Sequence, residues 1–305
     1  MKLYIIGNGF DINHGLPTSY SDFLKYVCLN HHDQFHKFGT MFSDSNPSKL
    51  WSDFEYELGN FDVIGSIHRN IKTWDDIVKL YPHDGFLKIG KIIETFRGKL
   101  IDLFEMWVKE TIIEKHATAK YILDRSDYYL VFNYTNVLNT TYCIDESHTC
   151  YIHGNCANNH LRKPEVGHGL SNEKIKEYVN SQVEKIIPLV KKTNFSVENI
   201  SSEYEELLKL LRKESQLLLE QKRKFFDLVL GFNIESVWIL GHSMSEIDSL
   251  YLNEINNFIP QETPIFVSYY AKNEIGDLME HANKYFTNHP ISFHKIEDIL
   301  QPINL

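Results

Sequence analysis

Short apolar segments, bounded by glycine, asparagine or proline, recur along the chain and indicate β-strands. Nearly continuous apolar runs of four to eight residues are typical of parallel strands whose two faces are both covered. The first such run ends at Gly7, and Gly9 follows after one asparagine. The pattern predicts six strands, at residues 2–6, 128–132, 149–153, 237–240, 265–269 and 291–293.

Segments with helical spacing of apolar residues separate most of these strands. They predict helices at 21–30, 48–59, 74–80 and 85–115, and a second helical region richer in Lys and Glu at 171–230. Strands that alternate with helices favour an α/β fold. We therefore expect a Rossmann-like, mostly parallel sheet in one α/β domain over 1–305, with large helical insertions at about 18–120 and 171–230.

Composition and charge narrow the class of partner. The 31 basic and 41 acidic residues give a net charge of −10, which argues against a broad nucleic-acid surface. Four cysteines are too few for a disulfide framework. No stretch approaches the roughly 18 apolar residues that a membrane span needs, and the apolar run after Lys2 is too short for a signal peptide. We expect a cytoplasmic protein that binds a small molecule and not a membrane.

Polar and glycine-rich loops follow four of the predicted strands, at residues 7–11, 133–136, 153–155 and 241–248. In an open parallel sheet the carboxyl ends of the strands line one crevice, so these loops are expected to lie together. Backbone amides near the first loop suit a phosphate group. The residues nominated for binding are Gly7, Asn8, Gly9, Phe10, Asp11, Tyr134, Gly154, Gly241, Ser243 and Asp248, and Asn133 and His153 stand in the same loops.

Each of these residues also has a purely structural interpretation. The first two glycines of the chain can serve a tight turn alone, and Asn133 can cap a helix that begins near residue 135. His153 can be a core histidine bonded to a backbone carbonyl, and Asp248 can stabilise the first turn of a helix at 247–257. These structural explanations must all hold at once to exclude a site, whereas one shared pocket explains all four loops.

Other motifs point less specifically to chemistry. The opening glycines depart from the dinucleotide fingerprint G-x-G-x-x-G, because Ile12 stands at the third position. The sequence around Ser243 departs from the G-x-S-x-G nucleophile elbow at its last glycine, which leaves serine hydrolysis as an alternative. The loop around His168 is either a ligand loop, with Arg162 and Glu165, or a turn.

A zinc site is a further alternative, because five potential ligands lie within eighteen residues. They lack the paired C-x-x-C spacing that makes a zinc assignment specific, so we expect no metal. The five residues are Cys143, His148, Cys150, Cys156 and His160.

Five motifs, in order along nearly the whole chain, resemble the AbiH family of bacteriophage abortive-infection proteins. Its opening glycine motif is distinctive. The matching segments are 5–11 (IIGNGFD), 14–20 (HGLPTSY), 51–55 (WSDFE), 132–136 (FNYTN) and 152–154 (IHG).

A more distant resemblance bears on mechanism. The 132–135 segment is similar to the T-N-Y-D loop of sirtuin-like NAD-consuming domains in other phage-defence systems, where a His-Gly pair and a G-x-S-x-x-x-D stretch follow. This chain has the His-Gly pair at 153–154, and its stretch at 241–248 has one residue more between the serine and the aspartate. In those relatives the asparagine and the histidine lie at the nicotinamide ribose, which nominates Asn133 and His153 as catalytic residues. The aspartate of that loop is Thr135 in this chain, and the opening glycine motif also differs.

The resemblance implies an abortive-infection effector that hydrolyses NAD, or a related nucleotide, at its N-glycosidic bond. The nucleotide would be a substrate, with no prosthetic group. It also implies a phage-derived trigger protein and a homo-oligomer as partners. The sequence leaves open a second class of function, a nucleotide-binding sensor or toxin-like interaction module without turnover, and Thr135 favours that alternative.

Overall fold

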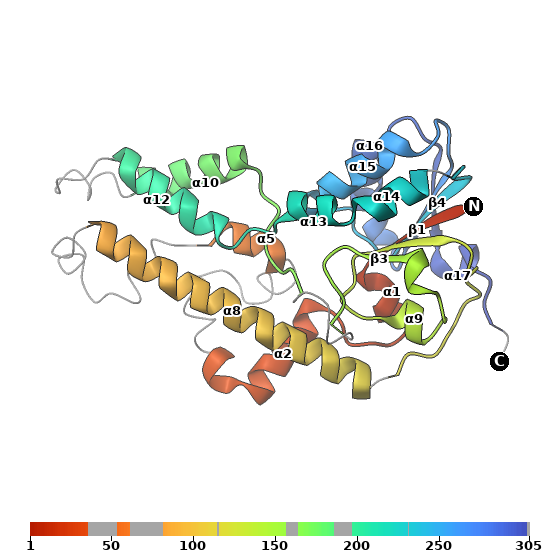
Figure 1. Ribbon diagram of the computed structural model, residues 1–305, viewed down its shortest axis with the longest axis horizontal. Coiled ribbons are helices and arrows are strands. Elements are labelled where there is room, and N and C mark those ends of the chain that lie inside the picture. Colours follow the sequence, from red (N-terminus) through yellow and green to blue (C-terminus); the bar gives the residue numbers. More distant parts are fainter. Residues whose placement is uncertain are drawn as a thin grey trace. The chain divides into compact units, whose positions relative to one another are not determined.

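The computed structural model describes residues 1–35, 54–61, 82–114, 116–156, 164–185, 197–230 and 232–303. The chain folds into two compact units. The first comprises Met1–Ser19, Glu105–Glu165 and Glu214–Leu305, and the second comprises Tyr20–Phe104 and Val166–Lys213. Figure 1 shows the helices and strands of both units.

The first unit is built on a six-stranded sheet whose strands are all parallel, in the order β3-β2-β1-β4-β5-β6. All six strands predicted from the apolar runs are present, and the α/β, Rossmann-like prediction is confirmed. The strands are β1 (Lys2–Ile6), β2 (Tyr128–Val131), β3 (Thr149–Tyr151), β4 (Ser236–Leu240), β5 (Ile265–Tyr269) and β6 (Ile291–Lys295).

The predicted ends of the second and third strands were wrong. The second strand ends at Val131 instead of residue 132, and the third ends at Tyr151 instead of residue 153. The run of apolar residues continues one position past the last paired residue of each strand, because Phe132 and Ile152 are still buried. His153 therefore lies beyond the sheet, in the loop that follows.

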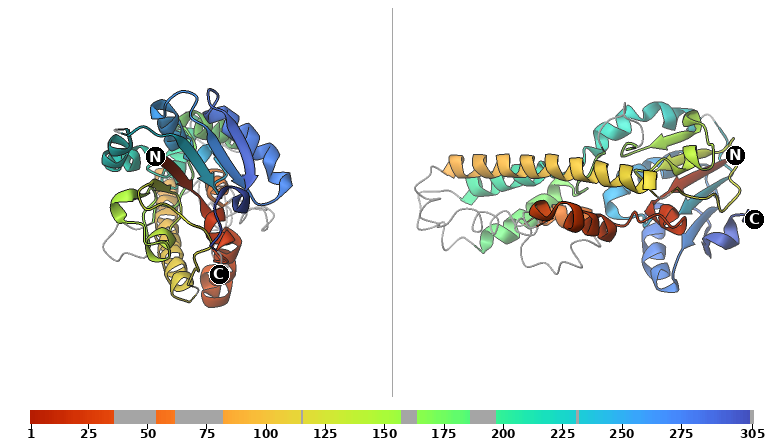
Figure 2. Two further views of the ribbon diagram at one scale, coloured as in Figure 1. Left: turned by 90° about the vertical axis from the view of Figure 1, so that its right-hand side faces the viewer. Right: turned by 90° about the horizontal axis from the view of Figure 1, so that it is seen from below.

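Alternate residues of each central strand enter two different cores, because successive side chains of a strand point to opposite faces. On β1, Leu3 and Ile5 belong to one core, and Tyr4 and Ile6 belong to the other. Figure 2 shows helices on both sides of the strands. The first core takes side chains from α13 (Ser215–Gln221), α14 (Arg223–Leu230), α15 (Ser249–Phe258) and α16 (Ile275–Tyr285), and the second from α1 (Asn8–Asn13), α9 (Val137–Thr140) and α17 (Ile296–Ile299).

The strand order reverses between β1 and β4. Chain order runs outward from β1 to β3 on one side and outward from β4 to β6 on the other. In open α/β sheets the carboxyl ends of the strands at such a reversal form the crevice in which ligands bind. The loops after β1 and β4 are therefore the first places to look for a site.

The second unit contains the cores of both predicted insertions. Its described helices are α2 (Tyr20–Asn30), α5 (Phe54–Gly59), most of α8 (Pro82–Glu114), α10 (Asn172–Glu184) and α12 (Val197–Lys209). The predicted helix at 74–80 and the first part of the one at 48–59 lie outside the described residues. The ends of the insertions, at 105–120 and 214–230, belong to the first unit, where α13 and α14 cover the sheet.

A buried ion pair and a buried histidine hold the second unit together. The Nζ atom of Lys213 lies 2.7 Å from Oε1 of Glu55, and the lysine side chain is 1% exposed. His168 is fully buried: its Nε2 donates to the Leu208 carbonyl at 2.9 Å and its Nδ1 accepts from the Leu170 amide. Burial lowers the pKa of His168 to about 4. Both ring nitrogens have protein partners, which favours the turn over the ligand loop; Arg162 lies outside the described residues.

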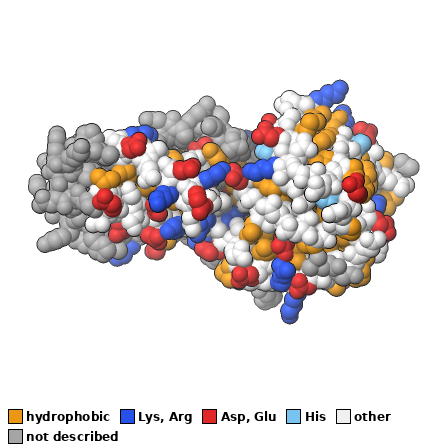
Figure 3. All heavy atoms as spheres, turned by 90° about the horizontal axis from the view of Figure 1, so that it is seen from above, with side chains coloured by type: hydrophobic (Ala, Val, Ile, Leu, Met, Phe, Trp, Pro, Cys, Tyr) orange, Lys and Arg blue, Asp and Glu red, His pale blue; other side chains and the backbone are white. Residues whose placement is uncertain are grey.

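Acidic and basic side chains of the described residues are interspersed on the face drawn in Figure 3. A surface that binds nucleic acid needs an extended positive field, and interspersed charges do not give one. In the described part of the chain, no helix is both long and apolar enough to pass through a bilayer.

Candidate functional site

Four polar side chains follow the four adjacent strands β3, β2, β1 and β4 at the same level. The last paired residues of β1 to β4 are Ile6, Val131, Tyr151 and Leu240, which align with one another across the sheet. The residues two positions further along each strand are Asn8, Asn133, His153 and His242. The register of the sheet thus brings asparagine and histidine side chains from distant parts of the sequence to one edge.

The loops after β1 and β4 are packed backbone against backbone. A Cβ atom on Gly7 would lie 2.4 Å from the Gly241 carbonyl oxygen, and Gly241 itself has a φ of +62° that favours glycine. The amide of Gly7 donates to Leu240 and that of Gly9 donates to Gly241. These two amides bind backbone carbonyls, so they do not face a phosphate group as the sequence predicted. The glycines allow close approach of the two loops.

The carboxylate of Asp248 lies between two imidazole rings. Its Oδ1 is 3.4 Å from Nε2 of His153, and its Oδ2 is 3.4 Å from Nε2 of His242. Both histidine side chains are at most 4% exposed, and the aspartate side chain is 12% exposed. A carboxylate in this position can orient an imidazole and stabilise the imidazolium that forms when the ring accepts a proton.

The loop that carries His242 fixes the tautomer of its ring. The backbone amide of Met244 donates to Nδ1 of His242 at 2.9 Å, so the proton of the neutral ring is on Nε2, facing Asp248. Met244 is buried and has a φ of 53°, which is unusual for a residue with a side chain. Such conformations cost about 1–3 kcal/mol and cluster at functional sites.

Aromatic rings enclose the two histidines. The ring of Phe132 meets His242 edge-on, with 4.3 Å between centroids, and meets His153 at 5.6 Å. Tyr134 stacks against His153 at 6.0 Å, and Tyr251 contacts the same ring edge-on at 5.8 Å. These contacts hold the imidazoles in fixed orientations within apolar surroundings, where the Asp248 charge acts more strongly than it would in water.

A second cluster joins helix α1, which follows β1, to the loop after β2. The hydroxyl of Thr135 donates to Oδ2 of Asp11 at 2.6 Å, and the side chain of Asn133 also bonds to this carboxyl group. Asp11 is 1% exposed, and its burial raises the pKa to about 7, although the two hydrogen bonds lower it. The carboxyl group can therefore gain or lose a proton near neutral pH.

Asn133 is placed as a ligand-binding group would be. The residue is 4% exposed, and its buried Oδ1 has no hydrogen-bond partner among the described residues. It caps no helix: α9 begins at Val137, with Asn136 at its N-cap. A buried carbonyl oxygen without a partner loses free energy, so its retention suggests that something outside the chain donates to it.

The hydrogen bonds of Asp248 do not support the structural interpretation that it stabilises the first turn of a helix. Asp248 is the N-cap residue of α15, yet its side chain makes no capping hydrogen bond. The carboxylate faces the two histidines instead.

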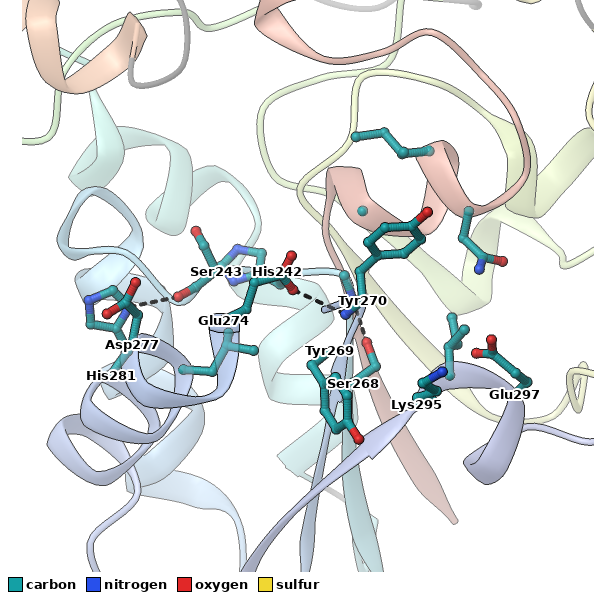
Figure 4. Close-up of a pocket in the computed structure, with 16 residues that line it drawn as sticks. His242, Ser243, Ser268, Tyr269, Tyr270, Glu274, Asp277, His281, Lys295 and Glu297 are labelled. Atoms are coloured by element: carbon teal, nitrogen blue, oxygen red, sulfur yellow. Dashed lines mark hydrogen bonds between the residues drawn. The ribbon is translucent and has the colours of Figure 1, made fainter. Parts of the chain in front are cut away.

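Two predicted binding residues, Phe10 and Asn8, take other positions. Phe10 is fully buried in the sheet core against His14, so it is a packing residue. The side chain of Asn8 donates to the Thr18 carbonyl at 2.8 Å. Ser243 is exposed and lines a cavity together with Gly9, Gly241 and His242, where its carbonyl accepts from Nδ1 of His281 (Figure 4). Gly154 follows His153 directly and has a φ of +89°.

The cysteines that suggested zinc have other surroundings. Burial raises the pKa of both Cys150 and Cys156 to about 12, so these thiols are neutral at pH 7. Cys143 is exposed, and His160 lies outside the described residues. Within the described ranges, no three His, Cys, Asp or Glu side chains are grouped so that they could hold a metal ion.

His242 is the site residue that the sequence-based prediction missed. It stands two residues after the end of β4, as His153 stands two residues after the end of β3. This equivalence is a usable signal, although the glycine and serine pattern points to the neighbouring Gly241 and Ser243 instead. The contact between Thr135 and Asp11 has no local signal, because the two residues are 124 positions apart.

Comparison with known proteins gives one match. The family model described as bacteriophage abortive infection AbiH matches residues 3–269, which is most of the chain. No curated protein and no solved structure matches.

Proposed function

The chain belongs to the AbiH family, whose role is defence against bacteriophage by abortive infection, and we propose that it acts by hydrolysing NAD or a related nucleotide. The bond broken would be the N-glycosidic bond. One observation carries the proposal: buried Asn133 presents an oxygen that no described residue binds, at the sheet edge where Asp248 lies 3.4 Å from His153. The proposed outcome is depletion of the nucleotide, which stops the infected cell and the phage together.

The side chains at this edge suit the chemistry of such a bond. Its cleavage passes through an oxocarbenium-like state, in which positive charge develops on the ribose. Nicotinamide leaves as a neutral group, so the protein needs to supply positioning and charge complementarity more than a strong acid. The Oδ1 atom of Asn133 and the carboxylate of Asp11 are oxygen groups that can hold a ribose hydroxyl or face this charge.

The histidine pair suits the activation of water. As water attacks C1′ of the ribose, the C1′–N bond breaks and its electron pair goes to the departing ring. The proton of the water would go to the neutral ring of His153, and Asp248 would stabilise the resulting cation. His242 would bind the other carboxylate oxygen and hold it in place. Protonation during the reaction would shorten the 3.4 Å separations, as is common for sites that tighten around substrate.

Asp11 provides a carboxyl group next to Thr135, where the sirtuin-like pattern has an aspartate. The threonine hydroxyl donates to the carboxyl group of Asp11 in helix α1. A carboxyl group is thus present at this place, supplied from the helix that follows β1. This supports an enzyme in spite of the substitution.

The test is nicotinamide release from NAD by the purified full-length protein. We expect release by the wild type, and a loss of roughly 10²–10⁴-fold in His153→Ala and Asn133→Ala, the range typical of an acid–base group. His148→Gln is the matched control, because His148 immediately precedes β3 and His153 follows it. A release rate that survives both alanine substitutions would remove the assigned mechanism.

The second candidate function is a nucleotide-binding sensor without turnover. The bonding of the Gly7 and Gly9 amides to backbone carbonyls favours it, because the usual cradle for a pyrophosphate is occupied. Mass spectrometry of the protein as purified would then detect a retained nucleotide and no cleavage product. A phage challenge belongs beside both assays, since we propose that a phage-derived trigger and assembly into an oligomer raise the activity of the resting protein.

A further inference from the structure

A cavity of about 740 Å³ opens at the carboxyl ends of β4, β5 and β6, on the other side of the strand reversal from Asn133. Its volume falls within the ~300–1,000 Å³ range of small-molecule sites. Figure 4 shows side chains from the ends of these strands and from α16 around it. His242 lines the cavity and also binds Asp248, so the cavity adjoins the candidate site.

An exposed tyrosine is among the residues that line this cavity. Tyr270, directly after β5, is 80% exposed, and its backbone amide is held at 3.0 Å by Oε2 of Glu274. In the view of Figure 4 its ring lies between Asp277 and His281 on one side and Glu297 on the other. Ile12 of α1, 44% exposed, adds apolar surface from a different element. Apolar and aromatic surface from two elements suits a planar ring, because every nucleobase can stack on an aromatic face.

The charges of the cavity argue against a phosphate group as occupant. Among the described residues that line it, three carry carboxylates, Glu274, Asp277 and Glu297, and one is a lysine, Lys295. Carboxylates repel phosphate but accept hydrogen bonds from the hydroxyls of a ribose. The lining therefore fits the base and sugar of a nucleoside.

The position of the cavity relates it to the proposed reaction. From β2, which precedes Asn133, to β5, which precedes Tyr270, there are three strand spacings, or about 14 Å. Dinucleotides bind across the carboxyl edge of such sheets where the strand order reverses. We infer that this cavity binds the nucleoside of a dinucleotide substrate that lies away from the bond to be cleaved, with its base on Tyr270. This inference rests on the proposed function for the identity of the other half.

The first test measures binding without catalysis. Adenosine is titrated calorimetrically into the wild type, Tyr270→Ala and Asn133→Ala. We expect Tyr270→Ala to bind adenosine at least about tenfold more weakly, as loss of a base–aromatic stack predicts, and Asn133→Ala to bind like the wild type. Tyr56→Ala is the control, because Tyr56 is also exposed and does not line the cavity. The alternative probe is inorganic phosphate.

The second test uses turnover. For Tyr270→Ala we expect the KM for NAD to rise about tenfold with kcat unchanged, and cleavage of nicotinamide mononucleotide, which lacks the second nucleoside, to be unaffected. Absence of adenosine binding by the wild type, equal binding by Tyr270→Ala, or displacement of adenosine by phosphate would overturn the inference. Adenosine binding with no nicotinamide release would instead remove the proposed reaction and leave the nucleoside site. Nicotinamide release that is unchanged in Tyr270→Ala would support the proposed reaction and overturn the nucleoside site.

Discussion

Replacement of Asp11 by asparagine tests the buried carboxyl group of the site. Burial raises the pKa of Asp11 from 3.8 to about 7. The unfolded chain then loses this proton near pH 3.8, while the folded protein keeps it until about pH 7. Between these values the folded state binds more protons, so the free energy of unfolding must fall as pH rises. The shift of about three pH units corresponds to about 4 kcal/mol of lost stability above pH 7.

Asp11→Asn removes the titration and keeps nearly the same shape. We expect the mutant to gain stability relative to the wild type by about 3 kcal/mol between about pH 5 and about pH 8, the part of the shift that falls in this window. Urea unfolding of both proteins over this range measures the difference at each pH. Other titrating groups are common to the two proteins, so their contributions cancel.

An exposed aspartate provides the matched control. The hydroxyl and amide of Ser147 hold the pKa of Asp145 below its usual value, so its contribution to stability is lost only at acidic pH. The difference between Asp145→Asn and the wild type should thus stay flat between about pH 5 and about pH 8. A flat difference for Asp11→Asn as well would show that the Asp11 carboxyl group is ionised in the folded protein, and the reasoning would fail.

Two further predictions concern stability alone. Gly241→Ala should lower the free energy of unfolding by at least about 3 kcal/mol, and lower the Tm, since its Cβ would lie 2.2 Å from the Phe10 nitrogen and its φ is +62°. Gly98→Ala, with open space around it in α8, should raise the free energy of unfolding by up to about 1 kcal/mol. Equal effects of the two substitutions would contradict the packing of the loops after β1 and β4. Lys213→Met should cost about 3 kcal/mol in urea unfolding, because it leaves the Glu55 carboxylate, only 14% exposed, without its cation, whereas Lys209→Met, from an exposed pair, should stay within about 1 kcal/mol. A small effect at Lys213 would refute the burial of that pair.

The fold was predictable because parallel strands covered on both faces leave a local record. Runs such as Leu3 to Ile6 are apolar throughout, and each is followed by residues that stop a strand. The ends of β2 and β3 were less predictable, since Phe132 and Ile152 are buried without being paired in a strand. Burial sets the apolar pattern, and the amides of Phe132 and Ile152 still donate to Ile6 and Val131, whereas the strand ends where the ladder of paired residues stops. Only burial is visible in the sequence.

The candidate site was predictable only in part. The carboxyl-edge rule nominated Asn133, His153 and Asp248 from their places after strands, and the structure brings the last two within 3.4 Å. The rule did not select His242, and it assigned the opening glycines to a phosphate. The acceptor for a backbone amide at the end of a strand is set by the neighbouring strand, and the sequence does not show which strands are neighbours.

The sequence by itself determined the six strands, the helical segments between them and the set of loops in which chemistry can occur, because apolar periodicity and turn residues act over a few positions. Only the tertiary structure decided that Asp248 faces His153 from a distant part of the chain, that Thr135 reaches Asp11, and that Gly9 donates to Gly241. These contacts follow from strand order and register. Both are set by how the whole chain packs, because a hydrogen bond or a desolvated carboxyl group depends on what lies beside it in space.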